Sequence, residues 1–235
     1  MTTPIDPMKL ALLDAILPHV AFDGWSPLAF DAAVAELGLP VPLASALCPR
    51  GAVDLAVLFH HQGDDAMAAA MAEHDLGAMR YRDRVAEALW LRLSVVQDKE
   101  AVRRGSALFA LPHMAPEGST LMWGTADRIW TALGDSSDDV NWYTKRMTLS
   151  AVYSAVVLYW LGDEDPDLVA TRAFIDRRIE NVMQFEKFKA QVRGNAVLKP
   201  LTALVQSLTS GIRAPSRMPD ADLPGVWRKP GQAED

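Results

Sequence analysis

Residues 121–161 read LMWGTADRIWTALGDSSDDVNWYTKRMTLSAVYSAVVLYWL, and the organisation of the whole chain follows from this stretch. Four of the seven tryptophans lie in it, at positions 123, 130, 142 and 160. Apolar residues recur at spacings of three and four on both sides of the polar break at 134–139, which is typical of two amphipathic helices. The pattern predicts a helical hairpin, against which the preceding helices pack and which the following helices complete.

The second helix of this hairpin begins with two aromatic residues, Trp142 and Tyr143. Adjacent helical residues diverge by about 100°, so at least one of these rings is expected to reach solvent, whereas the other three tryptophans are expected to pack in the core. Arg146 follows Trp142 by four residues, which places its guanidinium over the indole. Exposed aromatics beside an arginine are typical of protein-binding hot spots, and plain core packing is the alternative.

The rest of this helix is apolar nearly all round. Ala151, Ser154 and Ala155 leave one shallow side on which another helix can approach closely. We therefore expect a central helix or one at a subunit interface.

Composition limits the class of protein. Half of the 235 residues are hydrophobic and 23% are charged, which fits a globular chain with a sizeable core. The net charge of −7 argues against binding nucleic acid or anionic lipid through charge alone. The single cysteine, Cys48, excludes an internal disulfide and is expected to be a small buried residue rather than a nucleophile. Neither a membrane-spanning run nor a targeting pattern is evident, so the expected location is a bacterial cytoplasm or its membrane face.

Residues 1–50 have the spacing of a three-helix, DNA-binding helix-turn-helix module. Asp6-Pro7 and Ser26-Pro27 are start signals for two helices, and a short third helix fits between Pro42 and Cys48. The side chains expected to face inward are Leu28, Ala32, Ala35 and Leu37. The net charge of this segment is −3, and its third helix offers only Ser45 as a polar contact. We interpret it as the shape of a DNA-binding module without its chemistry.

Residues 51–192 are expected to form a helical domain for ligand binding and dimerisation. The periodicity predicts helices over 51–79, where Gly63 could introduce a kink, and over 81–97, 98–111 and 167–192. Pro112, Pro116 and Gly118 are expected to form a turn before the hairpin.

The last periodic segment, residues 193–213, predicts an amphipathic helix, followed by an extended or disordered tail over 214–235. It either docks on the protein or lies in a membrane surface with its apolar stripe in lipid. Burial of six half-buried apolar side chains corresponds to about 5 kcal/mol, enough for reversible anchoring. The predicted membrane-binding residues are Val197, Leu201, Leu204, Val205, Leu208 and Ile212.

Catalytic motifs are absent from the sequence, which contains no phosphate loop, no nucleophile elbow, no paired-cysteine metal motif and no Glu-x-x-His. The best metal-ligand spacing is that of His60 with Asp64, or of His61 with Asp65. The two pairs point about 100° apart and have no third ligand nearby, so we interpret them as polar surface side chains. The sequence therefore predicts no catalytic residues, no metal and no cofactor.

Several motifs together resemble a known family. They are DVNWYTKR at 139–146, LSAVY at 149–153, DEDPD at 163–167 and FIDRRIENVM at 174–183. These segments are similar to the ubiquinone-biosynthesis accessory family that comprises the ninth mitochondrial Coq protein and its bacterial relatives. The resemblance extends to about Arg213.

This resemblance implies an all-α, TetR-like fold of about ten helices, a homodimer, an apolar pocket for an isoprenoid quinone or precursor, and a C-terminal membrane helix. It also implies a partnership with the di-iron demethoxyubiquinone hydroxylase. The family's partner surface falls on Trp142 and Tyr143, beside Arg146, with Asp127 and Ile129 as neighbours. The residues nominated for the lipid pocket are Phe109, Trp130, Met147 and Ala151.

The function expected from this resemblance is non-enzymatic: the protein binds an isoprenoid quinone intermediate and presents it to the hydroxylase at the bacterial inner membrane. One alternative is a TetR-type transcriptional regulator with a lipid-like ligand, which would bind DNA in a salt-dependent way. A small-molecule enzyme with a helical pocket is a third possibility, but it requires a titratable cluster that the sequence does not display.

Overall fold

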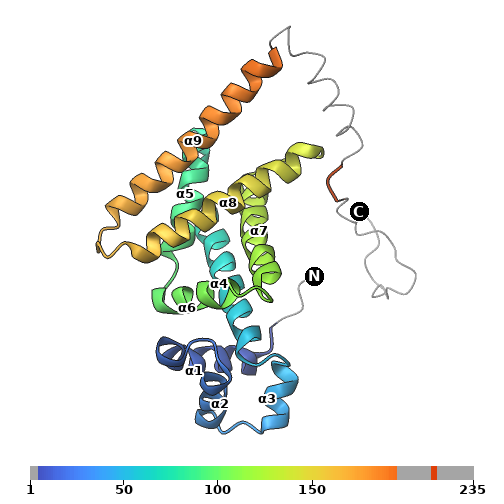
Figure 1. Ribbon diagram of the computed structural model, residues 1–235, viewed down its shortest axis with the longest axis vertical. Coiled ribbons are helices and arrows are strands. Elements are labelled where there is room, and N and C mark those ends of the chain that lie inside the picture. Colours follow the sequence, from blue (N-terminus) through green and yellow to red (C-terminus); the bar gives the residue numbers. More distant parts are fainter. Residues whose placement is uncertain (1–4, 195–212, 216–235) are drawn as a thin grey trace, which may run out of the picture.

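The computed structural model describes residues 5–194 and 213–215, with the side chains of the last helix described up to Gln184. Within these residues the chain forms nine α-helices and one 3₁₀ helix and no strand, which confirms the predicted all-α class. Figure 1 shows α1–α3 at one end of the molecule, α9 at the other, and the hairpin of α7 and α8 between them. The helices are α1 (Pro7–Asp23), α2 (Pro27–Glu36), α3 (Val41–Leu47), α4 (Ala52–Glu73), η1 (Leu76–Ala78), α5 (Tyr81–Ser94), α6 (Lys99–Phe109), α7 (Ala115–Ala132), α8 (Val140–Gly162) and α9 (Val169–Gly194).

The N-terminal helices begin at the predicted caps. Asp6 accepts a hydrogen bond from the backbone N–H of Met8 at 2.8 Å, and Ser26 accepts one from Ala29 at 3.2 Å. Both side chains satisfy N–H groups that the first turn of a helix leaves without a partner. The start of each helix is therefore determined locally, as the sequence indicated.

The predicted inward face of α2 is wrong. Leu28 is 64% exposed, and Ala35 and Leu37 are exposed as well. Because apolar residues lie almost all round this short helix, its pattern does not identify one face, and packing against α1 and α4 selects a different one. The residues that face the core are Ala29, Phe30, Ala33 and Val34.

Two further local predictions are also wrong. Helix α4 runs from Ala52 to Glu73 as one unbroken helix through Gly63. Helix α7 begins at Ala115, so Pro116 and Gly118 lie inside its first turns rather than in a turn before it. A proline in the first turn loses no hydrogen bond. Gly118 allows α6 and α7 to approach closely, because a Cβ at this position would lie 2.9 Å from Cβ of Phe109.

The buried side chains form two hydrophobic cores. One lies among α1–α4 and includes Trp25 and Cys48, which is buried as expected. The other lies among α4, α5, α7, α8 and α9 and includes Trp130 and Trp160, which confirms the packing expected of these two tryptophans. Trp123 is only half-buried.

The predicted membrane-binding segment cannot be placed in this fold. Its residues Val197, Leu201, Leu204, Val205, Leu208 and Ile212 lie outside the described residues. Among the helices that are described, none alone is long and apolar enough to cross a bilayer; α3 and α4 would pass together by length and composition, with a bend of 47° between them.

Candidate functional site

A cavity of about 770 Å³ lies where the two cores meet. Its wall is built from α1, α4, α5, α6, α7 and α8, with Trp25 and the segment 95–98 between helices. The size is that of a site for a small molecule or lipid. The apolar part of the lining includes Leu17, Phe59, Leu93, Phe109, Val157 and Trp160.

Three of the four residues nominated for the pocket line this cavity, namely Phe109, Met147 and Ala151. Trp130 does not. It lies two helical turns beyond Trp123, where α7 packs against the start of α5, and it stacks on Tyr81 with ring centroids 5.9 Å apart. Trp130 is therefore a core residue, and its assignment to the pocket is wrong.

The apolar wall of the cavity reaches the surface along α8. Met147 and Leu158 line the cavity and are 60% and 67% exposed. Ala151 and Ser154 lie between them on the same side of the helix at spacings of three and four. This is the shallow side that the sequence indicated, and it forms the solvent-exposed edge of the cavity.

His60 and Arg92, which line the cavity, belong to a polar network that the sequence did not predict. Arg92, from α5, donates from Nε to Asp64 of α4 at 2.7 Å and from Nη2 to the His60 carbonyl at 3.1 Å. Thr125, from α7, donates to the same Asp64 oxygen at 2.8 Å, and its hydroxyl lies 2.9 Å from Nε2 of His60. Four side chains from three helices thus form one buried network.

The interpretation of His60 and Asp64 as polar surface side chains is therefore wrong. Asp64 is 1% exposed, and its charge is balanced by Arg92, which is also buried. A buried carboxylate persists only when it is paired and hydrogen-bonded, as this one is. His61 and Asp65 do lie at the surface, where Asp65 pairs with Arg128. No group of acidic, histidine or cysteine side chains in the described part of the chain could hold a metal ion.

Two titratable groups of the cavity are uncharged near neutral pH. Burial, reinforced by the nearby Arg92 charge and opposed by Asp64, lowers the pKa of His60 to about 4. Burial also raises the pKa of Tyr153, on α8, to about 12. Both side chains therefore present hydrogen-bonding groups without a net charge.

The absence of a side chain at Gly63 allows the guanidinium of Arg92 to lie against α4. A Cβ on Gly63 would lie 2.6 Å from Nη1 and 2.7 Å from both Cζ and Nη2 of Arg92, so the guanidinium rests directly on the backbone of α4. The sequence did carry a signal for this site, because a glycine in an unbroken helix marks a close approach more often than a kink. Arg92 on the apolar side of its helix was the second signal.

The aromatic surface expected at the start of α8 is present in part. Trp142 and Tyr143 are half-exposed and form an edge-to-face pair, with ring centroids 4.8 Å apart. Trp123 packs beside both, at 5.8 Å from Trp142 and 6.4 Å from Tyr143. Because Trp123 also lines the cavity, the aromatic surface and the cavity share a wall.

Arg146 stacks on Trp142 as expected, with Cζ 4.0 Å from the ring centroid. It is nevertheless buried, with 1% of its surface exposed, and it donates to Asp127 at 2.5 Å and to Asp135 at 3.0 Å. Ile129 is fully buried in the core. In this conformation neither Arg146 nor Ile129 can contact a partner directly, so Trp142, Tyr143 and Asp127 remain as candidates for that contact.

The loop between α7 and α8 is fixed by the same arginine. Burial alone would raise the pKa of Asp135, but hydrogen bonds from Lys145, Ser137 and Arg146 together lower it to about 2. Two hydrogen bonds bring residues 213–215 to the start of α8. The Tyr143 hydroxyl donates to the Arg213 carbonyl at 3.3 Å, and Ala214 donates to the Asp138 carbonyl at 2.8 Å.

Comparison with known proteins confirms the resemblance to the ubiquinone-biosynthesis family. Residues 115–186, which include α7, α8 and most of α9, match the family model COQ9. A probable ubiquinone biosynthesis protein coq9, mitochondrial, from Dictyostelium discoideum is 29% identical over 194 residues, 79% of this chain and 62% of that protein. The human ubiquinone biosynthesis protein COQ9, mitochondrial, is 29% identical over 205 residues, 84% of this chain and 63% of that protein.

The chain thus spans 62% and 63% of the length of these two relatives. Both are named as mitochondrial proteins, whereas a location at a bacterial inner membrane stays a prediction for this chain.

A solved structure shows the same fold. It is the TetR transcriptional regulator from Nitrosomonas europaea ATCC 19718, which has 17% sequence identity to this chain and a TM-score of 0.61. The match covers 74% of this chain and 97% of the regulator. The predicted TetR-like fold is confirmed, and at this identity the likeness concerns the fold alone.

Proposed function

We propose that this protein is a non-enzymatic lipid-binding accessory protein of ubiquinone biosynthesis. In this role it binds an isoprenoid quinone intermediate in the cavity and presents it to the di-iron demethoxyubiquinone hydroxylase. The similarity to COQ9 proteins supports the role in ubiquinone biosynthesis. The observation that carries the lipid-binding step is the cavity of about 770 Å³, whose apolar wall reaches the surface on α8.

The shared wall between the cavity and the aromatic surface supports presentation. Trp123 contacts the cavity on one side and Trp142 and Tyr143 on the other. A partner that covers these two rings would therefore lie next to the bound lipid. Half-exposed tryptophan and tyrosine beside the charged Asp127 form a surface with the composition of a binding hot spot.

Mass spectrometry of lipid extracted from the purified protein tests the binding step. An isoprenoid quinone or precursor is expected to copurify with the wild-type chain. Ala151→Trp, which fills the cavity wall, should reduce the amount of that lipid, whereas Ala170→Trp, at an exposed position of α9 outside the lining, should not. Absence of isoprenoid lipid from the wild-type protein would refute the proposal.

Membrane attachment through residues 193–213 is part of the same proposal. Deleting residues 195–235 should release the protein from liposomes, because the predicted apolar stripe would be lost. Full retention of the shortened chain on liposomes would refute the anchoring.

A homodimer would use the exposed side of α8. Ala151, Ser154 and Ala155 are small enough for a second helix to approach closely, and the apolar side chains of Met147 and Leu158 flank them. Ala155→Arg is expected to convert the dimer to a monomer in a light-scattering measurement of molecular mass. A monomeric wild-type protein would refute this interface.

A TetR-type transcriptional regulator is the second candidate, favoured by the structural match to such a regulator. Against it stand the net charge of −3 over residues 1–50 and the lack of basic or amide side chains on α3. A mobility-shift assay at low salt separates the two functions. Sequence-specific DNA binding would favour the regulator.

A further inference from the structure

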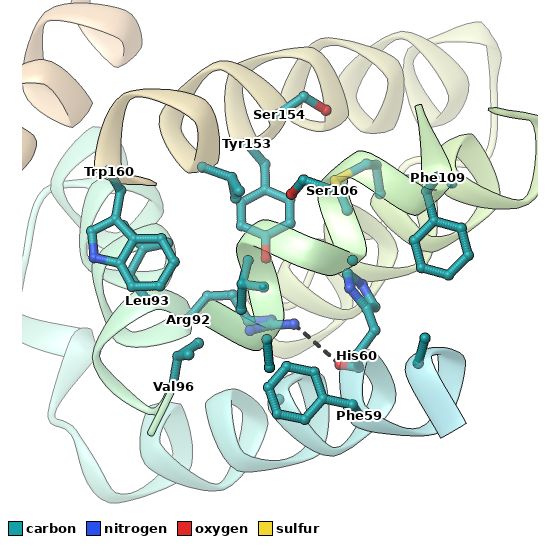
Figure 2. A pocket seen from close by; sticks show the side chains of 18 of the residues that line it. Phe59, His60, Arg92, Leu93, Val96, Ser106, Phe109, Tyr153, Ser154 and Trp160 are labelled. Carbon is teal, nitrogen blue, oxygen red and sulfur yellow. Dashed lines mark hydrogen bonds between the residues drawn. The ribbon is translucent and has the colours of Figure 1, made fainter. Parts of the chain in front are cut away.

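Three polar side chains of the cavity, His60, Arg92 and Tyr153, lie close together. Figure 2 shows Tyr153 extending from α8 towards Arg92, with His60 beside the same guanidinium, while Phe109 and Trp160 lie towards opposite sides of the view. Asp64 and Thr125 do not line the cavity, but they hold this group in place through hydrogen bonds to Arg92 and His60. These three side chains form a polar centre of the cavity, with the apolar rings of Trp160 and Phe109 on either side of it.

Two donors at this centre are available to a ligand. Arg92 uses Nε and Nη2 for its bonds to Asp64 and His60, and within the described residues its Nη1 makes no hydrogen bond. The Tyr153 hydroxyl likewise has no hydrogen-bond partner among those residues, although Tyr153 is 3% exposed. Both donor atoms keep accessible surface in the cavity, so a ligand oxygen placed there could accept hydrogen bonds from them and would be stabilised.

The charges at the centre favour a neutral ligand. The positive charge of Arg92 is already compensated by Asp64, at 2.7 Å. The other charged side chains of the described lining are Asp14 and Asp98, both acidic. An anionic head group such as a phosphate would therefore find no unpaired positive charge in the described lining, and the two carboxylates of the wall would repel it.

We propose that the polar centre is a subsite for a neutral oxygen acceptor, the carbonyl or phenol of a prenylated ring, with Arg92 Nη1 and the Tyr153 hydroxyl as donors. The apolar regions on either side take the hydrocarbon tail and the apolar ring substituents. Asp64 and Thr125 act as positioning residues. This inference rests on the proposed lipid-binding function and adds to it the class of head group that the cavity selects.

Three probes with the same tail test the subsite: a benzoquinone with a farnesyl tail, the hydrocarbon farnesene and farnesyl diphosphate. Their affinities are compared by displacement of Nile red from the full-length protein. The wild-type chain should bind the quinone more tightly than the hydrocarbon, and the diphosphate most weakly. Tyr153→Phe should weaken quinone binding about three- to tenfold, the factor that one hydrogen bond confers, and leave farnesene binding unchanged.

Tyr159→Phe is the matched control, because Tyr159 lies on the same helix but stacks on Phe174 outside the cavity. Unchanged farnesene binding by Tyr153→Phe also shows that this variant is folded. If Tyr153→Phe lost affinity equally for the quinone and for farnesene, or lost none for either, the subsite would be overturned. It would also be overturned if the wild-type protein bound the diphosphate most tightly. A wild-type protein that binds none of the probes would instead overturn the proposed lipid-binding function, and the subsite with it.

Discussion

Replacing Gly63 by alanine tests whether the guanidinium of Arg92 is fixed on the backbone of α4. The new Cβ would lie 2.6–2.7 Å from three guanidinium atoms, whereas carbon and nitrogen atoms in contact are about 3.4 Å apart or more. The group would have to move by about 0.7 Å or more. Such a shift would lengthen its 3.1 Å bond to the His60 carbonyl beyond hydrogen-bonding distance.

The expected change in stability combines two opposing effects. Loss of a hydrogen bond from a charged donor costs about 1.5–3 kcal/mol. Replacing a glycine inside a helix by alanine returns about 0.5–1 kcal/mol. Gly63→Ala should therefore lower the free energy of unfolding by about 0.5–2.5 kcal/mol, which for a chain of this size lowers Tm by about 2–4 °C for each kcal/mol.

Gly124→Ala is the matched control, since Gly124 lies inside α7 and no atom comes within 4 Å of a Cβ built there. This variant should be more stable than the wild type by about 0.5–1 kcal/mol. Urea denaturation of both variants measures the difference between them, expected at about 1.5–3 kcal/mol. Equal stability of Gly63→Ala and Gly124→Ala would refute the idea that Arg92 is fixed against α4.

Three further predictions concern the buried charges and the aromatic surface. Arg146→Met should lower the free energy of unfolding by about 1.5–3 kcal/mol in urea, because Asp135 would lose a charged hydrogen-bond donor and keep Lys145 and Ser137. A loss below about 1 kcal/mol would contradict this role. The pKa of His60 is about 4 in the folded protein, against an ordinary value of 6.5. Because His60 therefore binds a proton more readily in the unfolded chain, the free energy of unfolding should fall as the pH drops from about 6.5 to about 4. Over this range the free energy of unfolding of His60→Gln should fall less than that of the wild type. The control His61→Gln, which changes the exposed neighbour, should fall as much as the wild type. Identical pH profiles for all three proteins would count against a buried neutral His60. Trp142→Lys should abolish copurification with the di-iron hydroxylase while circular dichroism stays that of the wild type, and unchanged copurification would exclude this aromatic surface as the contact.

The sequence predicted most where the cause of the structure is local. Asp6 and Ser26 cap their helices through neighbours two and three residues away, so the starts of α1 and α2 could be read directly. The stacking of Arg146 on Trp142 could be read for the same reason, because the two residues lie one helical turn apart.

The sequence predicted less where partners come from different helices. The burial of Arg146 depends on Asp127 and Asp135, which belong to α7 and the loop after it. The pairing of Asp64 with Arg92 joins positions 28 residues apart, and no periodicity in either helix identifies the other. The exposed faces of α2 and the position of Trp130 were likewise decided by neighbours distant in sequence.

The position of the cavity at the boundary between the two hydrophobic cores affects how the molecule unfolds. Along the cavity, the core among α1–α4 is separated by an open volume from the core among α4, α5, α7, α8 and α9. A lipid tail in that volume would contact Trp25 and Phe59 on one side and Val157 and Trp160 on the other. The bound ligand would then pack against both hydrophobic cores at once. With the ligand bound, the two cores would unfold as one cooperative unit rather than as two.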